Sequence, residues 1–160
     1  MQENVFIEEP YILRKTWITK PYSEMDPQGE ASESYRINNL CWKLILFPQG
    51  YGGIKDHLSI FLRGKNIINP HPVQFSLRTV GGSKSAGNSC EFVFSKYVSN
   101  QGFFKFIPLN DIKSYLTPTG QLNLELIIEF RPKYPINGTS FRKDTGYVGL
   151  KKIKNSYFLN

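Results

Sequence analysis

The sequence contains one run, residues 122–130, in which every second residue is apolar. The apolar positions are Leu122, Leu124, Leu126, Ile128 and Phe130, and the polar residues Asn123, Glu125 and Glu129 lie between them. Side chains of a β-strand point alternately to the two faces of a sheet, so the run predicts a strand with one face in a core and the other in solvent. It is the clearest amphipathic strand of the chain and favours a sheet protein.

Further short strands are predicted between turns rich in Gly, Pro and Ser. They cover residues 11–20, 41–47, 57–62, 72–79, 91–98 and 103–107. Residues 108–116 are the one segment with a helical pattern, because proline suits a first turn and Leu109, Ile112 and Leu116 share one face. Residues 81–88 are predicted to be a flexible, exposed hairpin tip. Short strands with a single helix favour an all-β, antiparallel β-sandwich.

The net charge of +7 is concentrated at the C-terminal end of the chain. Residues 131–160 carry seven basic residues and one acidic residue, so residues 1–130 together carry only +1. Basic tails can contact nucleic acid or an acidic protein surface. These lysines form no compact run, which favours a solvated linker and leaves nucleic-acid binding as an alternative.

The residue types needed for catalysis or metal binding do not form a recognisable motif. Cys41 and Cys90 are about fifty residues apart, and neither they nor His57 and His71 show metal-ligand spacing. Cys41 follows an apolar pattern beside Trp42, where a thiol behaves as a small hydrophobe. Glu91 disfavours a thiolate at Cys90. We therefore expect no catalytic residue, no metal site and no cofactor.

The N-terminal residues 1–9 form a short acidic leader without the basic and apolar regions of a secretory signal. No apolar run reaches the ~20 residues that a membrane-spanning helix needs. These observations predict a nuclear or cytoplasmic protein with reduced thiols.

Four features occur in a distinctive order: Trp17, the run from Tyr35 to Gly50 with Trp42 within it, the run 57–62, and residues 102–112 before the last strand. In this order they resemble a MATH domain, the TRAF-like eight-stranded antiparallel β-sandwich, over residues 10–132. The resemblance implies a reader of short extended peptides, working as a monomer or as a subunit of a hetero-complex.

The C-terminal segment, residues 133–160, sharpens the resemblance. Thr145-Gly-Tyr-Val-Gly-Leu150 is similar to the start of the catalytic domain in ubiquitin-specific proteases that carry an N-terminal MATH domain. Those proteases continue with Asn-Gln-Gly-Ala-Thr-Cys-Tyr-Leu-Asn, and the nucleophile position falls on Tyr157 here. A phenol with a pKa of ~10 cannot replace a thiolate. The resemblance implies a degenerate relative, a pseudoenzyme, or a piece that ends before the catalytic residues.

The resemblance also implies a set of peptide-binding residues. The Asp-Trp-Gly-Phe motif of the family's protease members falls on Asn100-Gln101-Gly102-Phe103, followed by Phe104, and an arginine of some members falls on Asn38. Core packing is the alternative role for Phe103. The function expected is a non-catalytic interaction module in a ubiquitin-linked or nuclear complex. Its alternatives are the recruitment domain of a longer deubiquitinating cysteine protease and a nucleic-acid binder.

Overall fold

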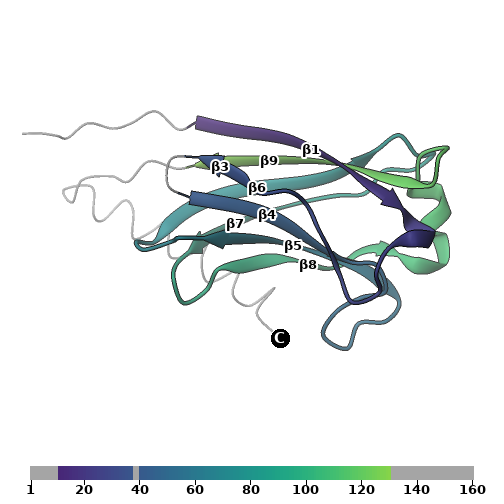
Figure 1. Ribbon diagram of the computed structural model, residues 1–160, viewed down its shortest axis with the longest axis horizontal. Helices are drawn as coiled ribbons and strands as arrows, with labels where there is room; N and C mark the ends of the chain where they lie inside the picture. The colour runs from purple at the N-terminus through teal and green to yellow at the C-terminus, as the bar shows by residue number, and fades with distance from the viewer. Residues whose placement is uncertain (1–10, 38–39, 131–160) are drawn as a thin grey trace, which may run out of the picture.

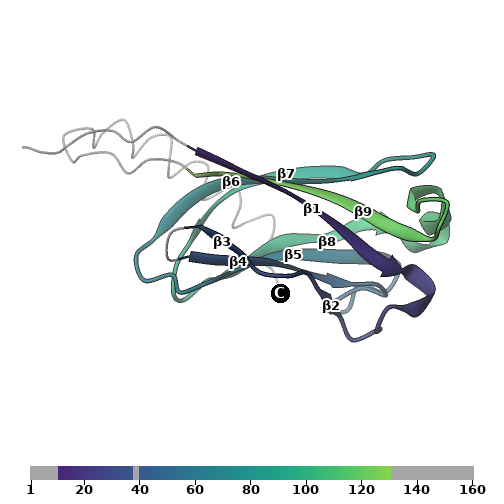
Figure 2. The same cartoon turned by 45° about the horizontal axis from the view of Figure 1, so that its top comes forward.

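The computed structural model describes residues 11–37 and 40–130, which form two antiparallel β-sheets stacked face to face (Figures 1 and 2). The first, the β9 sheet, has the strand order β1 (Tyr11–Pro21), β9 (Gln121–Phe130), β6 (His71–Val80) and β7 (Gly87–Phe94). The second, the β5 sheet, has the order β2 (Glu30–Ala31), β4 (Leu40–Phe47), β5 (His57–Lys65) and β8 (Asn100–Pro108), with β3 (Tyr35–Ile37) also pairing with β4. The predicted all-β sandwich is confirmed.

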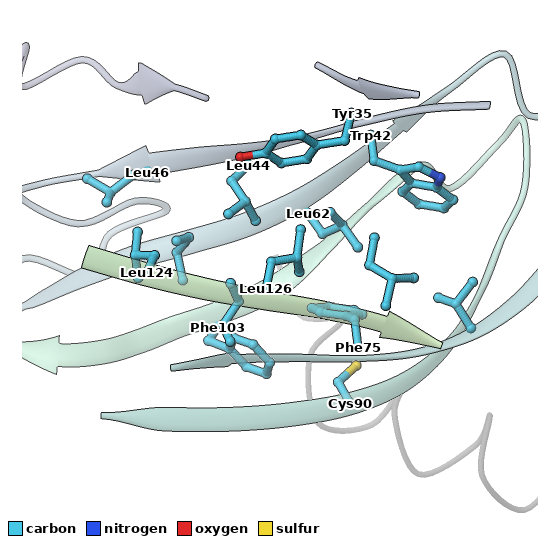
Figure 3. Close-up of a cluster of buried hydrophobic side chains, with 14 of the residues drawn as sticks. Tyr35, Trp42, Leu44, Leu46, Leu62, Phe75, Cys90, Phe103, Leu124 and Leu126 are labelled. Carbon is cyan, nitrogen blue, oxygen red and sulfur yellow. The ribbon is translucent and has the colours of Figure 1, made fainter. Parts of the chain in front are cut away.

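The alternation that predicts the last strand is the basis of the core. Residues 122–130 of β9 are buried at every second position, and β9 pairs with both β1 and β6. The facing residues of β4 are buried in the same alternating pattern. Figure 3 shows side chains of the two sheets meeting between the layers, among them Leu44, Leu62, Phe75, Phe103 and Leu126. Burial of these apolar side chains holds the two sheets together.

Several boundaries differ from the predicted ones. The described residues contain nine strands, because the short strands β2 and β3 precede β4, which corresponds to the expected strand 41–47. Strand β7 begins at Gly87 and ends at Phe94, whereas the pattern predicts residues 91–98. An additional 3₁₀ turn, η1 (Tyr22–Glu24), follows β1.

The predicted helix is present as the 3₁₀ segment η2 (Leu109–Tyr115). Leu109, Ile112 and Leu116 pack against the core as the pattern predicts, yet each stays only partly buried. Non-helical backbone angles at Asp111 divide the segment, and 3₁₀ geometry is typical of such short connecting pieces.

Candidate functional site

Strand β8 lies at the end of the β5 sheet, with β5 as its pairing partner. Gly64 of β5 donates its backbone N–H to the carbonyl of Ser99 at 2.8 Å. Bonded and unbonded pairs alternate in an antiparallel ladder, so the pairs Arg63–Asn100 and Phe61–Gly102 are unbonded ones. The backbone N–H and C=O groups of Asn100 and Gly102 therefore point away from β5, toward the edge of the sheet.

Gly102 lets the two strands approach each other closely at this point. A Cβ atom added there would meet the carbonyl oxygen of Ile60, and it would lie 2.5 Å from the Cα of Phe61. Both are backbone atoms, which cannot move aside as the end of a flexible side chain can. A side chain at position 102 would push β8 away from β5.

The sequence-predicted site residues divide between the two faces of β8. Asn100 is exposed, and its side-chain oxygen accepts a hydrogen bond from Nε of Arg63 at 2.9 Å. Phe104 is half-buried on the outer face. Gln101 and Phe103 point inward and are buried, and Phe103 packs against Phe75 of the other sheet (Figure 3). The sixth predicted residue, Asn38, lies outside the described residues.

Sequence reasoning missed three aromatic residues that gather around Phe104 on the outer face. Phe47, Tyr51, Phe61 and Phe104 form what we call the outer aromatic cluster, with ring centroids 4.5 to 6.2 Å apart. Tyr51 is 47% exposed, and its neighbours cover Phe61 down to 8%. Large apolar groups outside the core that remain partly open to solvent often mark an interaction surface.

Ser59 fixes the position of Phe104 within this cluster. Its hydroxyl is fully buried and donates a 2.7 Å hydrogen bond to the carbonyl of Phe104. The pairing register of β5 and β8 shifts between Leu58 and Ile60, at this same place. Such irregularities re-aim the side chains that follow them.

Neither cysteine is placed as a nucleophile would be. Burial raises the pKa of the Cys90 thiol to about 12, with a smaller contribution from the charge of Glu91, although a hydrogen bond with Gln101 acts in the opposite direction. Cys41 is half-buried on the outer face of β4, not within the core as its apolar pattern predicts. Within residues 11–37 and 40–130, no group of three or more His, Cys, Asp or Glu side chains could hold a metal ion.

His57 has a carboxylate partner at the surface. Its Nδ1 lies 2.9 Å from Oδ1 of Asp56, and this contact holds the pKa of the Asp56 carboxyl below its ordinary value. The nearby hydroxyl of Ser59 is buried and engaged with the backbone. The arrangement therefore does not assemble a nucleophile with a base. In the part of the chain that the structure describes, no helix is long and apolar enough to cross a membrane.

No family model matches the chain. It is 26% identical over 170 residues to ubiquitin C-terminal hydrolases 13 and 12 of Arabidopsis thaliana, an alignment that covers 99% of this chain and 15% of each hydrolase. It is also 27% identical over 125 residues to a MATH domain and coiled-coil domain-containing protein of the same plant, covering 71% of this chain and 41% of that protein.

The chain thus spans about 15% of the length of the curated hydrolases that it matches. The sandwich of nine described strands agrees with the architecture that the sequence motifs predict. The resemblance is confirmed: this chain is homologous to the N-terminal region of plant ubiquitin hydrolases and to a MATH-domain protein, and its sandwich is consistent with the MATH fold.

Proposed function

We propose that this chain is a non-catalytic interaction module that binds an extended segment of a partner protein along β8. The observation that carries the proposal is the edge of β8, where the backbone groups of Asn100 and Gly102 point outward beside the outer aromatic cluster. An extended peptide can pair with such an edge through main-chain hydrogen bonds, while side-chain contacts supply selectivity.

The six predicted residues receive different roles in this proposal. Asn100 and Phe104 offer their side chains to the peptide, and Gly102 offers backbone alone. Gln101 and Phe103 hold β8 in place from inside the sandwich, because their side chains are buried. Asn38 is proposed as a further contact because it follows β3 in the same sheet.

The non-catalytic part of the proposal is supported by the buried, high-pKa thiol of Cys90 and by the sequence of residues 133–160. We propose that this tail is a degenerate start of a protease domain, with Tyr157 at the nucleophile position. Its place in a ubiquitin-linked or nuclear complex is part of the same proposal.

A second candidate function is recruitment of substrates to a deubiquitinating activity carried by a longer protein. The similarity to two ubiquitin C-terminal hydrolases over nearly the whole of this chain favours it. Reading the gene beyond the codon for Asn160 tests this candidate. A downstream Cys box and His box would support it, and a stop codon there would exclude it.

Binding to β8 can be tested with a library of extended ten-residue peptides and a ¹⁵N-labelled chain. We expect affinities of about 1–100 μM, within the range of modest peptide affinities, with the largest chemical-shift changes at Asn100–Phe104. The variant Phe104→Ser should weaken binding roughly tenfold, as loss of an aromatic anchor does.

The matched control is Ile12→Ser, which removes an exposed apolar side chain, 49% accessible, from the β9 sheet. It should leave peptide affinity unchanged. Shift changes confined to the β9 sheet, or equal losses in the two variants, would contradict the assignment of β8.

A further inference from the structure

The two sheets carry different sets of charged residues. In the β5 sheet, strands β3, β4, β5 and β8 contain no Asp or Glu, and their cations are Arg36, Lys43, Arg63, Lys65 and Lys105. The two-residue β2 adds a single acidic residue, Glu30. The β9 sheet mixes both signs, and its Arg78 forms a 2.8 Å ion pair with the cross-strand residue Glu125. Because residues 1–130 carry only +1 in total, the β5 sheet holds far more than its share of positive charge.

Four of these cations lie on the outer face. Tyr35, Trp42 and Gly64 face the core, and the next residue along each strand, Arg36, Lys43 and Lys65, therefore faces outward. Arg36 pairs with Cys41, and Cys41 in turn pairs with Lys65. Lys43 lies directly opposite Arg63. The fifth cation, Lys105, is close enough to Asp56 to lower the pKa of that carboxyl.

This arrangement works against the stability of the sheet. Like charges directly opposite each other on neighbouring strands destabilise the pair. None of the ion pairs between described residues includes Arg36, Lys43, Arg63 or Lys65. Lysines on edge strands often prevent those strands from pairing with another chain. That role does not apply here, because β4 and β5 each have neighbouring strands on both sides. Arg63 does hydrogen-bond to Asn100, but that side chain is neutral. The opposed Lys43–Arg63 pair therefore has no counter-charge among the described ion pairs.

The cations and the outer aromatic cluster occupy adjacent parts of one face. Along β5, Phe61, Arg63 and Lys65 are outward-facing residues two positions apart, which corresponds to about 7 Å for each step. A peptide lying parallel to these strands has the same spacing. If the peptide pairs with the edge of β8, one apolar side chain level with Phe61 and Phe104 places the side chains two and four positions away level with Arg63 and Lys65.

We propose that this face selects an acidic extended peptide in which one apolar residue is followed or preceded, at two and four positions, by Glu or Asp. This rests on the proposed function and adds the chemistry of the partner. Carboxylates would neutralise the opposed cations of β4 and β5, and the apolar side chain would cover the exposed part of the aromatic cluster.

Single-stranded nucleic acid also combines negative charge with groups that stack on aromatic rings. The geometry favours the peptide. The rings of the outer aromatic cluster meet largely edge to face, with Phe61 and Phe104 at 84° to each other, and Phe61 is 8% exposed. Phe61 and Phe104 therefore do not offer the open, parallel faces on which bases stack, whereas the outward backbone groups of β8 match a peptide.

The test uses the full chain and fluorescein-labelled ten-residue peptides, followed by fluorescence anisotropy. The acidic probes are Ser/Gly peptides that contain Glu-x-Glu-x-Leu or Leu-x-Glu-x-Glu, which covers both strand directions. Matched probes carry Gln in place of Glu, and a ten-nucleotide oligouridine represents nucleic acid. We expect at least one acidic probe to bind about tenfold more tightly than its Gln version, with affinity falling as salt is raised.

The variant Lys43→Gln with Arg63→Gln should remove that preference. The matched control, Arg14→Gln with Lys113→Gln, changes the net charge equally at exposed positions outside the β5 sheet and should retain the preference. Equal loss in both double variants would overturn the proposal, because it would show a response to net charge alone.

The acidic preference and peptide binding along β8 are distinguished by different results. If the Gln peptide binds as tightly as the acidic one and shifts the resonances of Asn100–Phe104, the acidic preference is wrong and the proposed function stands. If no library peptide of any charge shifts those resonances, both are wrong. Tighter binding of oligouridine than of any peptide would overturn the choice of partner.

Discussion

Gly64 lies where β5 passes beside the indole of Trp42. A Cβ atom at this position would lie 2.5 Å from Cδ1 of Ile67 and 2.9 Å from Cζ3 of Trp42. Trp42 is 1% exposed and packs against Phe94 with ring centroids 5.0 Å apart. The indole is thus held between the two sheets and has little room to move.

We expect Gly64→Ala to lower the free energy of unfolding by about 1–3 kcal/mol, the usual cost of overpacking a core. The control is Gly87→Ala, where the nearest atom to the added Cβ would be 3.4 Å away, an ordinary contact. Urea denaturation of both variants measures the difference. Equal midpoints would show that the Trp42 side chain can move aside.

The buried hydroxyl of Ser59 supports a second prediction. Ser59→Ala removes a fully buried hydroxyl and leaves the carbonyl of Phe104 without the 2.7 Å hydrogen bond it accepts from that hydroxyl. Loss of a buried partner costs about 1–3 kcal/mol, so urea denaturation should show a decrease of this size. Ser76→Ala, on the half-buried face of β6, serves as control and should change stability by less than ~0.5 kcal/mol.

Alternation alone could have identified more of the site than the family motif does. In β4, Phe47 has the same parity as Lys43 and the opposite parity to Trp42, which predicts an outward ring. The family motif, in contrast, groups Gln101 and Phe103 with Asn100, although neighbouring residues of a strand face opposite ways. The aromatic cluster itself was beyond sequence reasoning, because Tyr51 joins it from a loop.

At the scale of elements, the loop between β6 and β7 is more firmly attached than its Gly/Ser composition predicts. The backbone N–H of Lys84 and the hydroxyl of Ser83 both donate to the carbonyl of Ser114. A Cβ atom at Gly82 would collide with the backbone of Ser114 and Tyr115. Composition predicts a flexible tip here because it cannot reveal that η2 offers a docking surface.

An ion pair between Lys84 and Asp111 completes this attachment and predicts a pH dependence. Nζ of Lys84 donates to Oδ2 of Asp111 at 2.6 Å, and this contact, with a hydrogen bond from Ser114, holds the pKa of the Asp111 carboxyl below its ordinary value. A depressed carboxyl pKa stabilises the fold above the unfolded-state value and loses that effect as the pH falls through the folded-state value.

Asp111→Asn should therefore lower Tm at pH 7, and the Tm values of the variant and the parent chain should converge toward pH 2. The pKa of Lys84 is raised by the same contact, so its contribution is present below its ordinary value and is lost only in strong alkali. Thermal unfolding monitored by circular dichroism between pH 2 and pH 7 measures the effect. A difference in Tm that stays constant over this range would contradict the role of the ion pair.

At the scale of the whole molecule, the sandwich and its two layers follow from the sequence because the buried faces of β4, β6 and β9 alternate clearly. The exact strand count does not follow, since β2 and β3 are two and three residues long and carry too little pattern. The uneven distribution of charge between the two sheets also could not be predicted from the sequence, because it appears only when the strands are assigned to their sheets.

Every residue of the described hydrophobic core lies between Leu13 and Phe130. We therefore expect removal of residues 131–160 to change the free energy of unfolding by less than about 1 kcal/mol, while the net charge falls from +7 to +1. Urea denaturation of the two chains checks this expectation. Any nucleic-acid binding by the full chain should disappear with the tail, and retention of such binding would place it on the sandwich instead.

The outward position of Cys41 gives the proposed binding face a chemical handle. Cys90 is buried with a pKa of about 12, whereas Cys41 is half-buried between the register positions of Arg36 and Lys65. A thiol reagent should therefore label the folded chain in one fast step at Cys41, followed by a slow step limited by opening of the sandwich. A dye attached in this way would sit among cations that form no ion pair with the described residues, and it would report their occupancy by a partner without any substitution in the sequence.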